Sequence, residues 1–143
     1  MRRMRFIASA LFVAAALVAC GDSAAPVTLT AALTAEEEVP TPGPAGAEGT
    51  AELRVDRDAG QLCYKLTYQG IGTPTAAHVH TGAAGVAGPV AVNLDYAANG
   101  DEACVSVDGS QLADIVGDPG GHYANIHTAD YPEGAIRGQL TSS

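Results

Sequence analysis

The sequence has no tryptophan and few other aromatic side chains. Aromatic residues make up 5% of its 143 positions, whereas there are 17 glycines and 8 prolines. This composition argues against a helical bundle and indicates short strands separated by turns. The hydrophobic fraction of 47% is too high for a disordered chain, so the sequence predicts a packed domain.

Basic side chains are also scarce. The chain has 7 Lys and Arg against 16 Asp and Glu, and three of the basic residues, Arg2, Arg3 and Arg5, lie in the first five positions. Beyond residue 19 the chain keeps 4 basic and 16 acidic side chains, a formal charge of −12. Such an acidic surface repels a phosphate backbone, which excludes a general nucleic-acid-binding function.

No apolar run is long enough for a membrane-spanning helix, which needs roughly 20 residues. The longest, Phe6–Ala19, has about 14 and follows a basic start, as in a secretory signal. Its end, Leu17-Val-Ala-Cys20, resembles the bacterial lipobox. We expect residues 1–19 to be a lipoprotein signal peptide and residues 20–26 to be the lipidated Cys20 with a short tether. The protein would then be lipid-anchored to a membrane of the bacterial cell envelope and face an extracytoplasmic space. An ordinary signal peptide with an incidental cysteine is the alternative.

Runs of alternating apolar and polar residues recur between turn signals along the rest of the chain. They predict eight short strands, at residues 27–33, 50–56, 61–68, 76–80, 89–94, 103–107, 122–127 and 135–140. One short helix is predicted at residues 110–116, with Ser110 as its N-cap and Gly117 at its end. The pattern predicts an all-β fold, an antiparallel β-sandwich or Greek-key barrel, formed by one domain over residues 27–140.

Two cysteines remain once Cys20 is assigned to the anchor. By the alternation of their strands, Cys63 and Cys104 both lie on the polar face. A free thiol has no packing reason to lie there, and an extracytoplasmic space is oxidising. Strand parity therefore predicts a cross-strand disulfide between Cys63 and Cys104, with two unpaired surface thiols as the alternative.

Three of the four histidines occupy related positions on the predicted strands. His78 and His80 are two residues apart, so both rings lie on one face of an extended segment, and His127 shares a face with Asn125 and Tyr123 on a later strand. If the two strands are neighbours, the three histidines form a cluster suited to Cu or Zn. The alternative is a structural cluster whose ring and amide hydrogens satisfy backbone groups of adjacent loops.

Several segments together carry a family resemblance. They are Glu38-Val-Pro40, Gly49-Thr-Ala51, Ala77–Val90 (AHVHTGAAGVAGPV), Tyr123–Thr128 (YANIHT) and Tyr131–Leu140 (YPEGAIRGQL). With them the chain resembles the CHRD domain, named after chordin and also found in many bacterial secreted proteins, over about residues 27–140. The resemblance implies an all-β extracytoplasmic domain and no established reaction. Ala135 departs from the pattern, because the family commonly has Glu before Ile-Arg-Gly.

No nucleophile elbow, activated cysteine or phosphate-binding loop is recognisable. We therefore expect a non-enzymatic binding or structural module of the cell envelope, whose partner the sequence does not identify. A copper- or zinc-binding protein using the histidine cluster is the alternative. The His-Val-His segment is also similar to the copper ligands of Cu/Zn superoxide dismutase, but no zinc-ligand loop follows it, which disfavours a redox enzyme. Glu38, Asn125 and Arg137 are assigned structural roles, with Arg137 expected to be buried against a carboxylate such as Glu38.

Overall fold

A computed structural model describes residues 24–95 and 98–143 of the chain. The predicted signal peptide and Cys20 lie outside the described residues, as does the first part of the tether. In the described part of the chain, no helix has the length and apolar character needed to cross a membrane.

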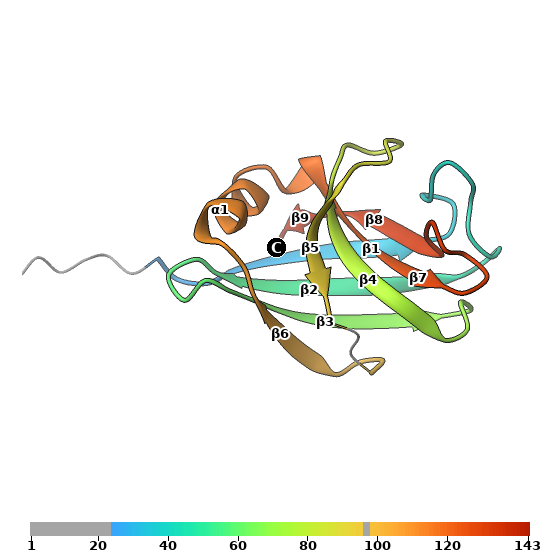
Figure 1. Ribbon diagram of the computed structural model, residues 1–143, viewed down its shortest axis with the longest axis horizontal. Coiled ribbons are helices and arrows are strands. Elements are labelled where there is room, and N and C mark those ends of the chain that lie inside the picture. The colour runs from blue at the N-terminus through green and yellow to red at the C-terminus, as the bar shows by residue number, and fades with distance from the viewer. Residues whose placement is uncertain (1–23, 96–97) are drawn as a thin grey trace, which may run out of the picture.

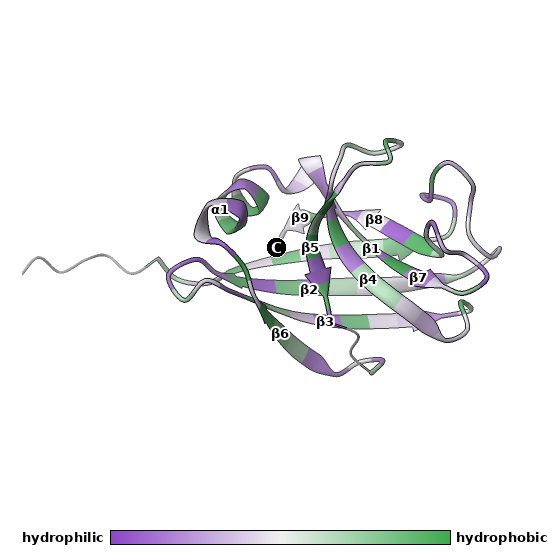
Figure 2. Cartoon of the chain, in the orientation of Figure 1, coloured by the Kyte–Doolittle hydropathy of each residue, from purple (hydrophilic) through white to green (hydrophobic). Residues whose placement is uncertain are grey.

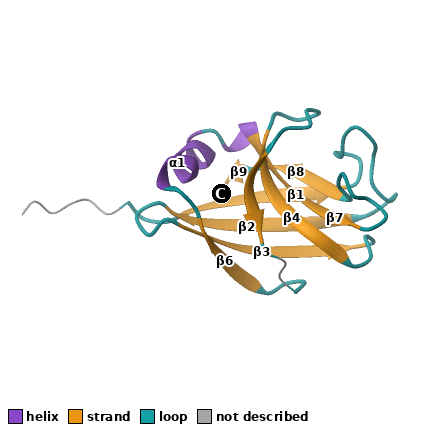
Figure 3. Cartoon of the chain, viewed as in Figure 1, coloured by secondary structure: helices purple, strands orange, loops and turns teal. Residues whose placement is uncertain are grey.

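One curled antiparallel sheet forms nearly the whole structure (Figures 1 and 3). Its strands are β1 (Val27–Thr34), β2 (Glu48–Asp56), β3 (Gln61–Gln69), β4 (Pro74–Thr81), β5 (Val90–Leu94), β6 (Glu102–Ser106), β7 (His122–Thr128), β8 (Ile136–Gln139) and β9 (Thr141–Ser142). Their order across the sheet is β5-β4-β7-β8-β1-β2-β3-β6, and β9 pairs with β1 beside this path. The all-β prediction is confirmed, and the sheet curls into a barrel-like form with β5 and β6 as its two edges.

The core lies on the inner face of the curled sheet. Along β2 the apolar residues Ala51, Leu53 and Val55 are buried and alternate with more exposed polar ones. Figure 2 shows this alternation of hydrophobic and hydrophilic residues along the strands. Each fully buried aliphatic side chain of leucine size stabilises the fold by about 1.5–3 kcal/mol. The sheet therefore curls with its apolar face inward.

A short helix, α1 (Gly109–Gly117), covers one end of the barrel and is followed by a 3-10 turn, η1 (Pro119–Gly121). The helix buries Leu112 and Ile115. Its N-cap is Asp108, so the predicted Ser110 cap is wrong. The Asp108 carboxylate accepts hydrogen bonds from both the backbone N–H (2.8 Å) and the hydroxyl (2.6 Å) of Ser110, and a carboxylate also gains from the positive end of the helix dipole.

The predicted disulfide is present and joins edge strand β6 to β3. Cys63 and Cys104 are directly opposite each other in the β3–β6 ladder, with an S–S distance of 2.05 Å. Although Cys63 lies on the outer, polar face, it is buried, because Arg54 and Gln61 lie against its sulfur.

The strands β4 and β7 are hydrogen-bonded neighbours that lie between edge strand β5 and strand β8. Their register places His78 opposite Asn125, His80 opposite Tyr123, and Ala76 opposite His127. Two histidines from one strand and one from the other therefore lie on the same small area of the sheet.

Candidate metal centre

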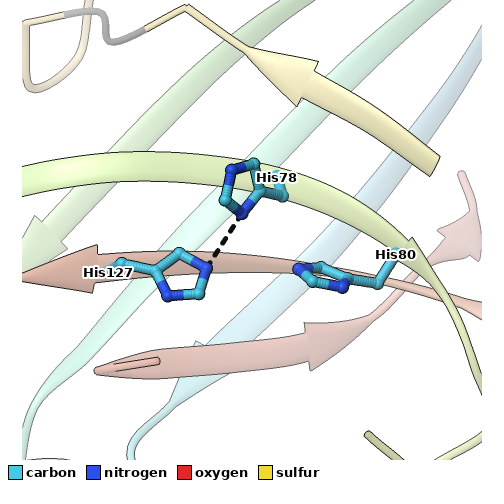
Figure 4. A group of neighbouring side chains, drawn as sticks. All are labelled: His78, His80 and His127. Carbon is cyan, nitrogen blue, oxygen red and sulfur yellow. Dashed lines mark hydrogen bonds between the residues drawn. The ribbon is translucent and has the colours of Figure 1, made fainter. Parts of the chain in front are cut away.

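The structure brings His78, His80 and His127 together on the outer face of the sheet (Figure 4). The intervening residues of β4 and β7, such as Val79 and Ile126, point into the core. Successive side chains of a strand point to opposite faces, so the histidines point away from the core. One ring nitrogen of each histidine lies within 4.8 Å of the other two.

This part of the outer face is not open surface. His80 and His127 are each only 8% exposed, and His78 is half-buried. Two loops contact the rings: the Nδ1 atom of His80 is 2.9 Å from the carbonyl oxygen of Gly88, and Nδ1 of His127 is 3.0 Å from that of Pro132. The loops at residues 82–89 and 129–135 thus shield the cluster, and His78 is its most exposed member.

The two backbone carbonyls determine where the ring protons lie. A carbonyl oxygen only accepts hydrogen bonds, so the Nδ1 atoms of His80 and His127 must carry the hydrogen. In a neutral imidazole the other nitrogen, Nε2, then has a free lone pair. A ring held by a carbonyl through one nitrogen and free at the other is the arrangement found in metal-binding histidines.

The free nitrogens converge on the side chain of Asn125. The Nε2 atoms of His80 and His127 both lie 3.0 Å from Oδ1 of Asn125. The Nδ1 atom of His78 is 2.9 Å from Nε2 of His127. Four potential ligand atoms, three nitrogens and one oxygen, therefore meet at one place.

Two of the three histidines have lowered pKa values. Burial, together with the neighbouring His127 and His80, lowers the pKa of His78 to about 4. Burial is also the main cause of the lowered pKa of His127, and His80 adds to it, against the opposing hydrogen bond to Pro132. Since only the neutral ring binds a metal ion, these lowered pKa values favour the ligand form of His78 and His127.

Tyr123 and Arg137 hold the loop that carries the Gly88 carbonyl. The Tyr123 ring stacks on His80, with centroids 4.7 Å apart and planes 2° apart, and its hydroxyl accepts a hydrogen bond from the Gly88 N–H. Arg137 lies over the Tyr123 ring at 3.4 Å and donates to the carbonyl oxygens of Ala83 and Val86, both at 2.8 Å.

Arg137 is buried, as expected, but its hydrogen bonds go to this loop and to Gln139 and not to Glu38. The Glu38 carboxyl is 4% exposed and packs against Gly134. Its Oε1 atom and the Nε atom of Arg137 are both buried without a hydrogen-bond partner. Burial raises the pKa of Glu38 to about 7, although the charge of Arg137 lowers it. The two side chains thus interact through space, and no hydrogen bond joins them.

Other groups of ligand-type residues in the described ranges do not form a second centre. Glu102 lies beside Cys63 and Cys104, but these cysteines are joined as a disulfide and offer no thiolate. His122 lies outside the cluster, and its Nδ1 atom is 2.8 Å from the carbonyl oxygen of Asp118.

Sequence reasoning missed the Gly88 and Pro132 carbonyls, because every residue carries a carbonyl and only the path of a loop decides where it points.

Comparison with known proteins identifies the family. The profile described as the CHRD domain matches residues 29–140, most of the chain. No curated protein and no solved structure matches the chain. A CHRD domain indicates that the protein is an extracellular binding module. The chain belongs to the CHRD domain family.

Proposed function

We propose that this protein is a lipid-anchored binding module of the bacterial cell envelope and that it binds a divalent transition-metal ion, Cu or Zn, through His78, His80 and His127. The observation that carries the proposal is the convergence of three imidazole nitrogens within 4.8 Å. Imidazole is a preferred ligand of both metals, and three of them are enough to form a protein site.

The surroundings of the rings support metal binding. The backbone carbonyls of Gly88 and Pro132 orient the rings of His80 and His127 and leave their Nε2 atoms without a hydrogen. Such outer partners typically change metal affinity 10- to 100-fold. The chain has 16 acidic and 7 basic side chains, and its negative charge also attracts cations to the molecule.

The anchor part of the proposal rests on the sequence. The basic start, the short apolar run and Leu17-Val-Ala-Cys20 are the features of a lipoprotein signal. The domain begins only a few residues later, at Val27, so an anchored protein would hold its domain close to the membrane surface.

Calorimetric titration of the metal-free protein with Cu²⁺ and Zn²⁺ tests the metal site. We expect one ion per chain, bound with micromolar or tighter affinity, and loss of binding in His78→Ala and in His127→Ala. His122→Ala is the matched control, since it removes a buried histidine outside the cluster and leaves the affinity unchanged. Absence of saturable binding in the wild type, or binding that survives both cluster substitutions, would return the histidines to a structural role.

A further inference from the structure

Building on the proposed metal site, we propose that Asn125 is its fourth ligand and that the resulting set of three nitrogens and one amide oxygen forms a tetragonal centre for Cu(II). Asn125 is 2% exposed and lies on β7, between His78 on β4 and Arg137 on β8 in the ladder. Pairing on both sides holds its backbone, so its side chain has little freedom to leave the cluster.

The four atoms follow one another in a path of nearly equal steps. His78 Nδ1 to His127 Nε2 is 2.9 Å, and His127 Nε2 to Asn125 Oδ1 is 3.0 Å. The last step, from Asn125 Oδ1 to His80 Nε2, is also 3.0 Å.

These steps are hydrogen-bond lengths in the metal-free protein, and they are also close to the edge of a square of ligands and shorter than the edge of a tetrahedron. With metal–ligand bonds of about 2.0–2.1 Å, two ligands at a right angle are about 2.9 Å apart, whereas two ligands at the tetrahedral angle are about 3.3–3.4 Å apart. Square-planar or tetragonal sites with nitrogen and oxygen ligands are typical of Cu(II), and tetrahedral sites are typical of zinc.

The position of Asn125 Oδ1 is the second argument. This oxygen is an acceptor, and both of its 3.0 Å neighbours are Nε2 atoms with free lone pairs, because their rings carry the hydrogen on Nδ1. His127 Nε2 also accepts a hydrogen bond from Nδ1 of His78 in the metal-free protein, so Asn125 Oδ1 and His80 Nε2 are the two acceptors that face each other with no hydrogen between them. A cation satisfies both, and His78 joins as a ligand when its ring hydrogen moves from Nδ1 to Nε2. The alternative is an amide turned around, so that its NH₂ group donates to both nitrogens and the cluster is purely structural.

Substitution of Asn125 separates these two arrangements, with Cu²⁺ as the probe and the mature protein as the sample. Asn125→Asp keeps an oxygen ligand but cannot donate a hydrogen bond, whereas Asn125→Leu has a similar size and offers no ligand. If the oxygen binds copper, Asn125→Asp binds Cu(II) at least as tightly as the wild type and Asn125→Leu at least about tenfold more weakly. If the amide is a donor and the cluster is structural, the wild type shows no saturable Cu(II) binding, and Asn125→Asp is the change that disrupts the cluster because it removes both hydrogen bonds. Asn93→Leu is the matched control, because Asn93 lies on β5 opposite His78 and outside the four-atom set.

Electron paramagnetic resonance of the copper-loaded protein tests the geometry. We expect an axial, tetragonal Cu(II) spectrum with coupling to three nitrogens, changed by Asn125→Leu and unchanged by Asn93→Leu. A wild type that binds neither Cu²⁺ nor Zn²⁺ would refute the proposed function as well. Copper binding with the same affinity and spectrum in Asn125→Leu would refute only the role of Asn125, and a tetrahedral spectrum would refute only the geometry. If Asn125→Leu does not fold, the affinity and spectrum of Asn125→Asp decide alone.

Discussion

Glu38 illustrates how a single buried residue couples the stability of this protein to pH. Its carboxyl is buried at the base of the loop that carries Pro132, and burial raises its pKa from 4.5 to about 7. Between these two values the folded protein keeps a proton that the unfolded chain has lost. The contribution of Glu38 to the free energy of unfolding is therefore complete below pH 4.5 and is lost as the pH rises through about 7.

Replacing Glu38 by Gln should remove this contribution to the pH dependence. His78 and His127, with lowered pKa values, act in the opposite direction, so the difference between wild type and variant is the quantity to measure. We expect urea unfolding to show that Glu38→Gln gains stability relative to the wild type as the pH rises from 4.5 to about 7. Glu37→Gln, at the exposed neighbouring position, is the control. If the difference in the free energy of unfolding between wild type and Glu38→Gln stays constant across this pH range, the raised pKa of Glu38 is contradicted.

The three histidine ligands could be foreseen from the sequence, but the residues that hold them could not. The two-residue spacing of His78 and His80 and the strand parity of His127 place the rings on one face, whereas Asn125 was expected on that face in a structural role. By contrast, Arg137 contacts carbonyl groups of residues more than 50 positions away, in a loop without any periodicity. Such contacts depend on how the loop folds back over the sheet.

At the scale of elements, the strands were predictable because each has a regular alternation and two turn signals. The two-residue strand β9 and the 3-10 turn η1 were not predicted, since elements of two or three residues have no periodicity to detect. The N-cap was placed two residues too late because Asp108 and Ser110 are both good capping residues, and only the hydrogen bonds distinguish them.

The loop between β4 and β5 carries one of the two carbonyls that orient the histidine rings. It crosses the end of β4 so closely that a Cβ atom on Gly88 would lie 1.7 Å from the carbonyl oxygen of Thr81. Gly88→Ala should therefore displace the loop and the carbonyl that orients His80. We expect metal affinity to fall about tenfold and the free energy of unfolding to fall by about 1–3 kcal/mol, measured by calorimetry and urea unfolding.

The control for this prediction is Gly117→Ala, at the end of α1, where an added Cβ meets nothing within 4 Å. Unchanged metal affinity in Gly88→Ala would show that the loop does not position His80.

For the whole molecule, the disulfide is the covalent link between the edge strand β6 and the rest of the sheet. It joins residues 41 positions apart, and the chain-entropy estimate for such a loop is about 3–4 kcal/mol. Replacing both cysteines by Ala should lower the free energy of unfolding by about this amount. Metal affinity should stay the same, because β6 and β4 lie in opposite halves of the sheet. Peptide mapping without reductant provides the direct check, and two freely alkylated thiols in the native protein would contradict the bond.

The proposed membrane anchor depends on Cys20. If this residue carries the lipid, Cys20→Ser should release the protein from the membrane fraction or leave its signal peptide uncleaved, because a serine cannot accept the thioether-linked lipid. Membrane fractionation and the mass of the mature chain measure both outcomes. Unchanged membrane association together with an unchanged mass would exclude a lipid anchor at this position.

The alternation along β4 and β7 has a consequence for how such a protein can evolve. Val79, Ala124 and Ile126 on the inner row pack in the core, whereas the outer row of β7 is equally buried but lies under two loops. A mutation in the outer row can therefore change ligand preference, but it also disturbs the contacts that hold those loops on the sheet. Two adjacent strands thus carry two heritable traits, core stability and ligand specificity, and a change in the second is constrained by the packing of the loops.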